Sequence, residues 1–187
     1  MKSLAQIMTI LCVFPAMMVA SAASADTFTI GQSYGAECYD NARSMGFSTA
    51  SINACNRAID DDTLTKKDRA ATYVNRGIVR AYLEDYDGAL ADYAEALKLS
   101  PDLAEAFANR GGALIKLERF DSALEALNKA LALSPKQPER VYYNRSIVYE
   151  IMGKTREAYE DLKKAAALAP QWTQPQRELQ RYQVVAR

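Results

Sequence analysis

Residues 109–135 read NRGGALIKLERFDSALEALNKALALSP, and their skeleton occurs once before and once after them. Each copy contains an Asn-Arg pair and a small residue: Asn75-Arg76-Gly77, Asn109-Arg110-Gly111 and Asn144-Arg145-Ser146. Two alanines and a proline follow in every copy: Ala89, Ala96 and Pro101; Ala123, Ala130 and Pro135; Ala158, Ala165 and Pro170. Intervals of 34 and 35 residues between the pairs indicate that one structural unit is used three times.

Each copy has the pattern of two helices. Apolar and small residues fall at helical spacing, as at Tyr142, Ile147, Tyr149 and Ile151. The Gly or Ser of the first helix and the alanines of the second allow two helix axes to approach closely. Proline occurs between copies or at helix starts, where its missing N–H is harmless. The sequence therefore predicts a series of helical hairpins.

This skeleton of a small residue, two alanines and a proline resembles the tetratricopeptide repeat. The resemblance covers residues 67–170, with repeats at about 70–101, 104–135 and 139–170. It implies an all-α fold, a right-handed α-solenoid of helical hairpins. The motif is specific for this fold and not for any one function.

Two flanking segments extend the predicted solenoid. Residues 26–66 are expected to form a degenerate first hairpin and a loop, because Ala58 aligns with the second alanine of the later repeats. Residues 171–187, which include Trp172 and Leu179, are expected to form a capping helix over the last repeat. Thr65 and Asp68 resemble a capping box at the start of the first full repeat, with Asp in place of Glu or Gln.

The first 25 residues have the pattern of a secretory signal peptide. Lys2 precedes an uncharged apolar stretch, and Ala23-Ser24-Ala25 forms a small-x-small cleavage site. We expect cleavage after Ala25, no membrane span thereafter, and a periplasmic protein, with secretion from another cell type as the alternative. The other interpretation of this segment is an uncleaved membrane anchor.

Two cysteines remain after that cleavage, Cys38 and Cys55. In the register set by Ala58 they occupy inward-facing positions on the two helices of the first hairpin. An even pair in an oxidising compartment favours a structural disulfide. A redox-active pair and a pair of free thiols are the alternatives, although the spacing is not Cys-x-x-Cys.

Composition argues against several classes of function. The chain has no His, the commonest general base and metal ligand, and it has 23 basic and 23 acidic residues. Balanced charge gives no support for nucleic-acid binding. The acidic run at residues 60–62 lacks the glycine and the distal Glu of a calcium loop. We therefore expect no catalytic residues, no cofactor and no metal.

The resemblance implies that the first helix of each repeat lines a concave groove. The predicted groove residues are Asn75, Ile78, Tyr82, Asn109, Arg110, Gly112, Lys116, Arg140, Tyr143, Asn144 and Ile147. Asn at this helix position can hydrogen-bond an extended peptide, or it can satisfy backbone groups between neighbouring helices. Tyr82, Arg140 and Tyr143 are the expected anchors, since aromatic and Arg side chains dominate interface energetics. The alternative is that some of these residues pack against the neighbouring hairpin.

The arginines of the Asn-Arg pairs have a structural interpretation. Asp92 and Asp161 stand sixteen residues after Arg76 and Arg145, which predicts an ion pair across each hairpin. The same offset from Arg110 leads to Ala126, so Arg110 is the arginine expected to be free for a ligand.

These observations favour a non-enzymatic interaction module that binds a peptide or helix of a partner protein, in an envelope-associated complex. A holdase-like chaperone or substrate receptor for exported proteins is the first alternative. A redox-active or enzymatic protein is the second.

Overall fold

The structure is a computed structural model that describes residues 34–44, 47–61 and 63–182. The predicted signal peptide at 1–25 and the last five residues lie outside the described part of the chain. The described residues form helices and no strand: α1 (Tyr34–Arg43), α2 (Thr49–Ile59), α3 (Lys66–Tyr82), α4 (Tyr86–Leu99), α5 (Ala104–Lys116), α6 (Phe120–Ala132), α7 (Pro138–Ile151), α8 (Thr155–Leu168) and α9 (Thr173–Leu179).

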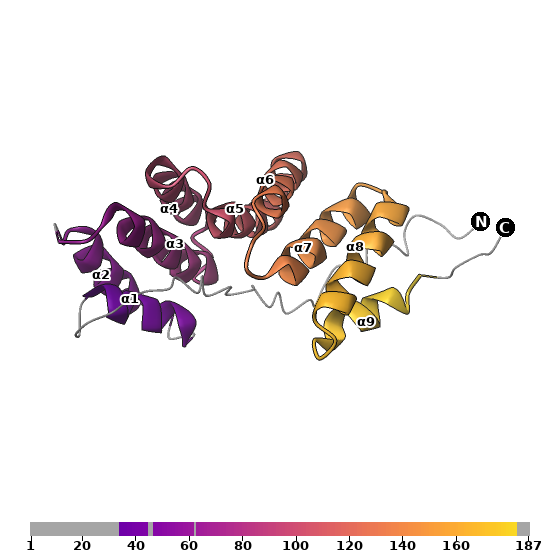
Figure 1. The fold of residues 1–187 in the computed structure, drawn as a ribbon, viewed down its shortest axis with the longest axis horizontal. Coiled ribbons are helices and arrows are strands. Elements are labelled where there is room, and N and C mark those ends of the chain that lie inside the picture. Colours follow the sequence, from indigo (N-terminus) through magenta and orange to yellow (C-terminus); the bar gives the residue numbers. More distant parts are fainter. Residues whose placement is uncertain (1–33, 45–46, 62, 183–187) are drawn as a thin grey trace.

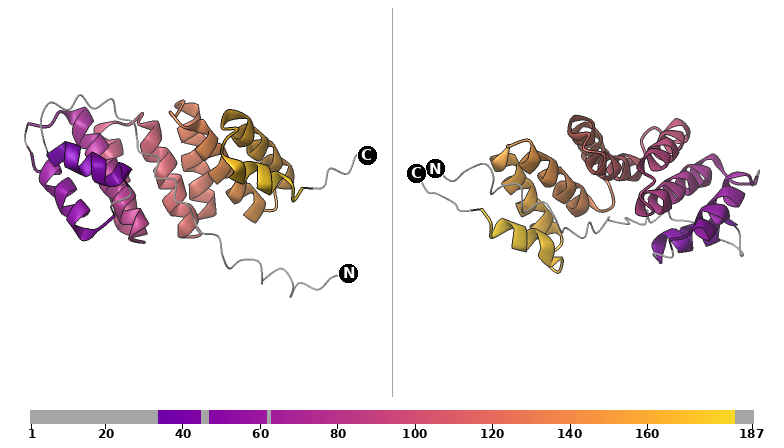
Figure 2. Two further views of the ribbon diagram at one scale, coloured as in Figure 1. Left: turned by 90° about the horizontal axis from the view of Figure 1, so that it is seen from below. Right: turned by 180° about the vertical axis from the view of Figure 1, so that it is seen from behind.

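Consecutive helices pair into hairpins, and the hairpins stack side by side in chain order (Figures 1 and 2). The stack follows an arch. α4 and α6 lie along its outer side, whereas α3, α5 and α7 lie nearer its inner side (Figure 1). Each hairpin contacts mainly the hairpins before and after it. The predicted all-α solenoid is therefore confirmed, and the first helices of the repeats share one surface.

Small residues set the distance between the two helices of a repeat. A Cβ added to Gly77 would lie 2.5 Å from Cε1 of Tyr93, and one added to Gly111 would lie 2.6 Å from Cγ of Leu127. Tyr93 and Leu127 are fully buried, each in the core of its own repeat. The small-residue position of the sequence skeleton is thus the point at which a large side chain of the second helix crosses the first.

The degenerate first hairpin consists of α1 and α2, and both helices pack on α3. Thr65 caps α3, because its hydroxyl accepts a hydrogen bond from the backbone N–H of Asp68 at 3.1 Å. The Asp68 carboxylate accepts from the Thr65 hydroxyl at 2.6 Å. The two side chains of the capping box therefore bond to each other, and Asp68 takes the place of the longer Glu that is usual at this position.

The last hairpin is covered by the chain that follows it. α9 packs on α8, and Trp172, Leu179 and Tyr182 pack against the buried residues Tyr143 and Leu162. None of the described helices is both long enough and apolar enough to cross a membrane.

Two adjacent glycines of α5 allow the packing argument to be tested. We expect Gly111→Ala to lower the free energy of unfolding by about 1–3 kcal/mol, because its Cβ would overlap Leu127. The matched control is Gly112→Ala, whose Cβ would meet nothing closer than Nδ2 of Asn144, at 3.8 Å. This control is expected to raise stability by about 0.5–1 kcal/mol through helix propensity. Urea denaturation followed by circular dichroism measures both, and equal effects would contradict the argument.

Candidate functional site

The inner surface of the arch is centred on α5. Asn109, Gly112 and Lys116 lie on one side of this helix, since residues three and four apart share a face. Lys116 is exposed, and the other two are partly exposed. Asn144 of α7 lies next to this line, as its closeness to the Gly112 position shows. The structure therefore brings together predicted groove residues from two repeats.

Asn109 is partly engaged within its own helix. Its Nδ2 donates to the backbone carbonyl oxygen of Glu105 at 2.9 Å. This bond satisfies a backbone group of the same helix, and not one of a neighbouring helix as the alternative expected. It uses only the amide N–H₂, so the Oδ1 acceptor of this side chain is not consumed by it.

The predicted groove residues of α3 are mostly buried. Asn75 is 3% exposed and Ile78 is 4% exposed, and Ile78 belongs to the core of the first full repeat. Oδ1 of Asn75 is buried without a hydrogen-bond partner among the described residues. Such an atom is uncommon, because a buried acceptor left unpaired costs about 1–3 kcal/mol.

Tyr82 lies at the C-terminal end of α3 and is 48% exposed. Its ring stacks on Phe47, which precedes α2, with the ring centroids 3.7 Å apart. The first hairpin therefore holds one face of Tyr82, and the remainder of the ring is available at the surface.

The predicted anchor Tyr143 is largely buried, with 9% of its surface exposed. Its ring packs on Trp172 with 4.9 Å between centroids, and Ile147 packs in the same cluster. Burial raises the pKa of the Tyr143 hydroxyl. Arg140 lies over the same Trp172, 5.9 Å from the ring centroid, and burial lowers its pKa. Tyr143 therefore packs against the segment that follows the last repeat, as in the alternative interpretation, and is not an exposed anchor.

The structure separates Arg110 from the other predicted groove residues. It is exposed, and on a helix with 3.6 residues per turn it points away from the side that carries Asn109, Gly112 and Lys116. Its neighbours on the same face are Phe107 and Leu114, which pack against α4 and α6. Arg110 therefore faces the outer side of the arch.

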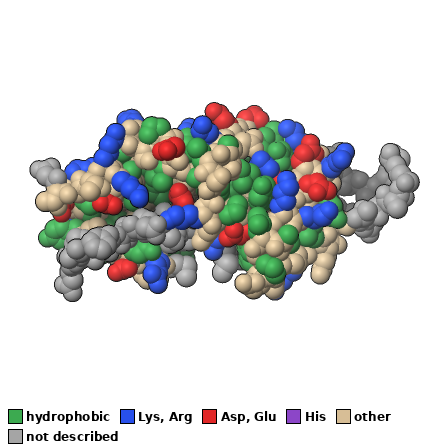
Figure 3. Space-filling model, in the orientation of Figure 1, with side chains coloured by type: hydrophobic (Ala, Val, Ile, Leu, Met, Phe, Trp, Pro, Cys, Tyr) green, Lys and Arg blue, Asp and Glu red, His purple; other side chains and the backbone are tan. Residues whose placement is uncertain are grey.

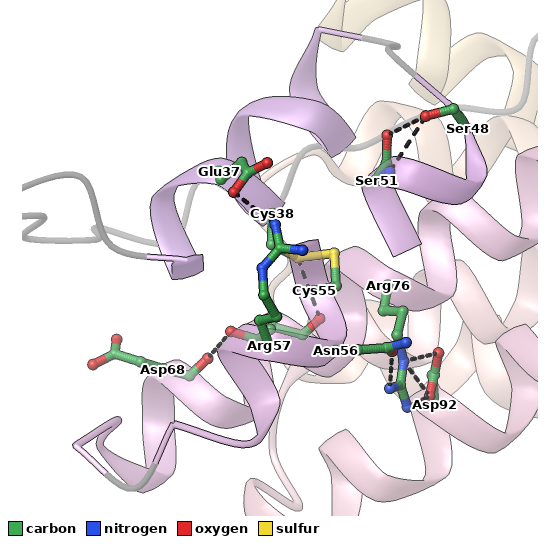
Figure 4. The surroundings of a disulfide bond; sticks show 11 residues. Glu37, Cys38, Ser48, Ser51, Cys55, Asn56, Arg57, Asp68, Arg76 and Asp92 are labelled. Carbon is green, nitrogen blue, oxygen red and sulfur yellow. Dashed lines mark hydrogen bonds and ion pairs between the residues drawn. A yellow bond between two sulfur atoms is a disulfide. The ribbon is translucent and has the colours of Figure 1, made fainter. Parts of the chain in front are cut away.

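The predicted ion pair between Arg76 and Asp92 is confirmed. Nε of Arg76 donates to Oδ2 of Asp92 at 3.0 Å, and Nη2 donates to Oδ1 at 2.6 Å. Nη1 donates to Oδ1 of Asn56 on α2 at 2.7 Å, so the guanidinium joins three helices (Figure 4). Asp92 is 2% exposed, and Arg80 lies 3.3 Å from the same carboxylate.

The same arrangement occurs at the third repeat, which confirms the second predicted pair. Arg145 donates from Nε and Nη2 to the two Asp161 oxygens at 2.6 and 2.9 Å. Nη1 donates to Oδ1 of Asn128 on α6 at 2.6 Å. Burial lowers the pKa of Arg145, but hydrogen bonding and charge from Asp161 outweigh it and raise the pKa overall. We call each set of Asn, Arg and Asp a junction triad.

The amide members of the junction triads, Asn56 and Asn128, were missed in the sequence. They stand 20 residues before Arg76 and 17 residues before Arg145. The offset varies because α3 has ten residues before Arg76, whereas α7 has seven before Arg145. Counting from the second alanine would have found them, since each Asn stands two residues before Ala58 or Ala130.

A disulfide joins Cys38 of α1 to Cys55 of α2 (Figure 4). Both residues are fully buried, and Sγ of Cys38 lies 4.0 Å from the backbone carbonyl oxygen of Thr72 on α3. The same two helices are also joined by an exposed ion pair, in which Nη2 of Arg57 lies 3.2 Å from Oε2 of Glu37. Closing a loop of this size stabilises a fold by about 3 kcal/mol in the chain-entropy view. The bond therefore fastens the hairpin that rests on α3.

Chemically, the described surface offers hydrogen bonds, charges and aromatic faces. On the face in view in Figure 3, apolar, acidic and basic side chains are interspersed. Within the described ranges, no group of three or more Cys, Asp or Glu residues is placed to hold a metal ion.

Comparison with protein families gives one consistent result. Family models described as tetratricopeptide repeat match residues 68–136 and 139–171, which together make up more than half of the chain. A comparison with curated proteins gives no match.

Solved structures with the same arrangement include MamA from Desulfovibrio magneticus RS-1, at 21% identity and a TM-score of 0.63, covering 81% of this chain and 84% of that one. The first TPR of Spaghetti (RPAP3), bound to the HSP90 peptide SRMEEVD, is 23% identical with a TM-score of 0.59, covering 63% and 94%. YrrB, a TPR protein with an unusual peptide-binding site, is 23% identical with a TM-score of 0.61, covering 68% and 63%. Likeness at this identity shows the fold.

Breaking one junction triad should destabilise the solenoid. Asp161→Asn keeps the side-chain shape but leaves Arg145, which is 15% exposed, without its charge partner. We expect the free energy of unfolding to fall by about 2 kcal/mol, less than for a fully buried pair. Glu125→Gln on α6 is the control, because Glu125 is exposed, and should change stability by less than about 0.5 kcal/mol. Urea denaturation distinguishes them, and equal losses would show that the triad adds no stability.

Proposed function

Because the chain belongs to the tetratricopeptide repeat family, we propose that it is a non-enzymatic protein-interaction module that binds a peptide or helix of a partner protein along its inner surface. The proposal assigns no catalytic step and no cofactor to the chain.

The observation that carries the proposal is the pair of partly exposed asparagines on the inner surface, Asn109 of α5 and Asn144 of α7. Asn75, Asn109 and Asn144 occupy the same position on α3, α5 and α7. An amide side chain has both donors and an acceptor, which matches the alternating C=O and N–H groups of an extended peptide. At the equivalent position of α3, Asn75 is 3% exposed, so its unpartnered Oδ1 is buried and is not open to a ligand.

The remaining inner-surface residues suit a mixed peptide rather than a phosphate. Tyr82 offers an exposed aromatic face, and Lys116 an exposed cation. Two of the structural relatives support this class of ligand, since one was solved with a bound peptide and the other is described by its peptide-binding site.

Photo-cross-linking tests the proposed surface. A photoreactive amino acid is placed at Lys116 on the inner surface or, as the matched control, at the exposed Lys129 on α6. We expect a discrete partner to cross-link at position 116 and not at position 129. The double substitution Asn109→Ala and Asn144→Ala should weaken this cross-link about tenfold, because it removes two hydrogen-bonding side chains from the groove.

Other outcomes of this experiment decide between the functional classes. A broad set of unfolded proteins at position 116 would favour a holdase-like chaperone. Cross-links at position 129 that survive the double substitution would contradict the inner-surface assignment.

We further propose that this module works outside the cytoplasm, in the periplasm or as a secreted protein. The support comes from the signal-like residues 1–25 and from the buried bond between Cys38 and Cys55, since disulfides persist in oxidising compartments.

Export can be tested by expressing the full chain in a Gram-negative host. We expect fractionation to recover it from the periplasm, N-terminal sequencing to read from Asp26, and alkylation without reductant to leave Cys38 and Cys55 unmodified. A Cys38→Ser, Cys55→Ser variant is the control for the alkylation signal. Recovery of a chain that retains residues 1–25, and in which Cys38 and Cys55 are both alkylated, would contradict the proposal.

A further inference from the structure

The outer side of the arch has three equivalent junctions, each between the second helices of consecutive hairpins. α2 and α4 flank Arg76, α4 and α6 flank Arg110, and α6 and α8 flank Arg145. At the first and third junctions the guanidinium donates to two carboxylate oxygens on one side and to an amide oxygen on the other. The molecule thus contains two internal examples of what this arginine position binds.

The middle junction keeps the arginine and lacks both acceptors. Ala126 of α6 stands at the position of Asp92 and Asp161, and Ala94 of α4 at the position of Asn56 and Asn128. Within the described part of the chain, the Arg110 side chain has no hydrogen bond, ion pair or ring contact. The aromatic contact is also lost, since Arg76 lies over Tyr73 and Arg145 over Tyr142, but nothing comparable joins Arg110 to Phe107.

The surroundings of Arg110 are apolar. Phe107 and Leu114 flank it along α5, and alanine methyl groups replace the polar side chains on the facing helices. A peptide that covers these apolar side chains removes water from around the guanidinium and so strengthens an ion pair formed there. A planar guanidinium pairs most strongly with a carboxylate, through two parallel hydrogen bonds.

We propose that Arg110 is a second docking site, on the outer side of the arch, for an acidic peptide segment of a partner protein. The Asp or Glu side chain of this segment takes the place that Asp92 and Asp161 hold at the other junctions. A backbone carbonyl oxygen beside it takes the place of the Asn amide oxygen. A peptide provides a carboxylate and an amide oxygen together, which is the pair of groups missing from this junction.

The test is to complete the junction from within the chain. The double substitution Ala94→Asn and Ala126→Asp supplies both missing groups and occupies Arg110. The probe is a displayed library of random dodecamer peptides, selected on the full chain. We expect peptides retained by the unaltered protein and rejected by the completed junction to contain Asp or Glu. Their synthetic forms should bind the completed junction, and Arg110→Gln, about tenfold or more weakly by isothermal titration calorimetry.

Two controls keep the result specific. Arg110→Gln removes an exposed side chain and should melt with the unaltered protein, so its loss of binding reports the site rather than the fold. The groove variant Asn109→Ala, Asn144→Ala should bind the same acidic peptides unchanged. If the cross-linking test at position 116 fails, that result contradicts the proposed inner surface and leaves the Arg110 site untouched.

Three outcomes would overturn the proposal. The first is that no selected peptide distinguishes the unaltered protein from the completed junction. The second is that those that do so lack acidic residues. The third is concentration-dependent self-association that the completed junction abolishes in analytical ultracentrifugation, because the carboxylate would then come from a second copy of this chain.

Discussion

The close approach of the two helices within each repeat is the constraint on which the rest of the structure depends. Tyr93 and Leu127 can cross the first helix of their repeats only because Gly77 and Gly111 have no side chain there. This contact fixes the spacing of the first two full repeats, and the buried Ser146 occupies the same position in the third. Repetition of the hairpin places α3, α5 and α7 on one surface. The outer junctions, at which second helices of neighbouring hairpins face one arginine, follow from the same spacing.

A repeated scaffold makes departures from the repeat informative. The junction triads at Arg76 and Arg145 join three helices each with buried charge, an arrangement that stabilises only while every member is present. At Arg110 the acid and the amide are replaced together by alanine. Because the acid and the amide are both absent, no buried carboxylate is left without a partner. Among the three triad positions, the only charged group that remains at this junction is the guanidinium of Arg110. The middle repeat thus has no buried carboxylate at this position to pair, and its arginine is exposed.

The features that could be read from the sequence are those that lie within one repeat. The hairpins, the close-packed glycines and the offset of sixteen residues between Arg76 and Asp92 all belong to a single unit. Contacts between units were harder to predict. The offset to Asn56 or Asn128 depends on how far the next helix extends before its arginine. The burial of Tyr143 depends on where Trp172 lies after the last repeat. Periodicity identifies a helix face, but it does not tell which neighbouring segment covers that face.

The two ends of the solenoid are occupied by the chain itself, and this concentrates the accessible surface at its centre. At one end the disulfide-linked hairpin packs on α3, where Asn75 and Ile78 are buried and Phe47 holds Tyr82. At the other end Trp172 covers Tyr143. α5 lies between two full hairpins and carries partly exposed Asn109 and exposed Lys116 on its inner side, with exposed Arg110 on its outer side. The terminal segments that protect the core from water therefore leave the inner side of α5 accessible, within the described part of the chain. The exposure of Arg110 on the outer side follows instead from Ala94 and Ala126.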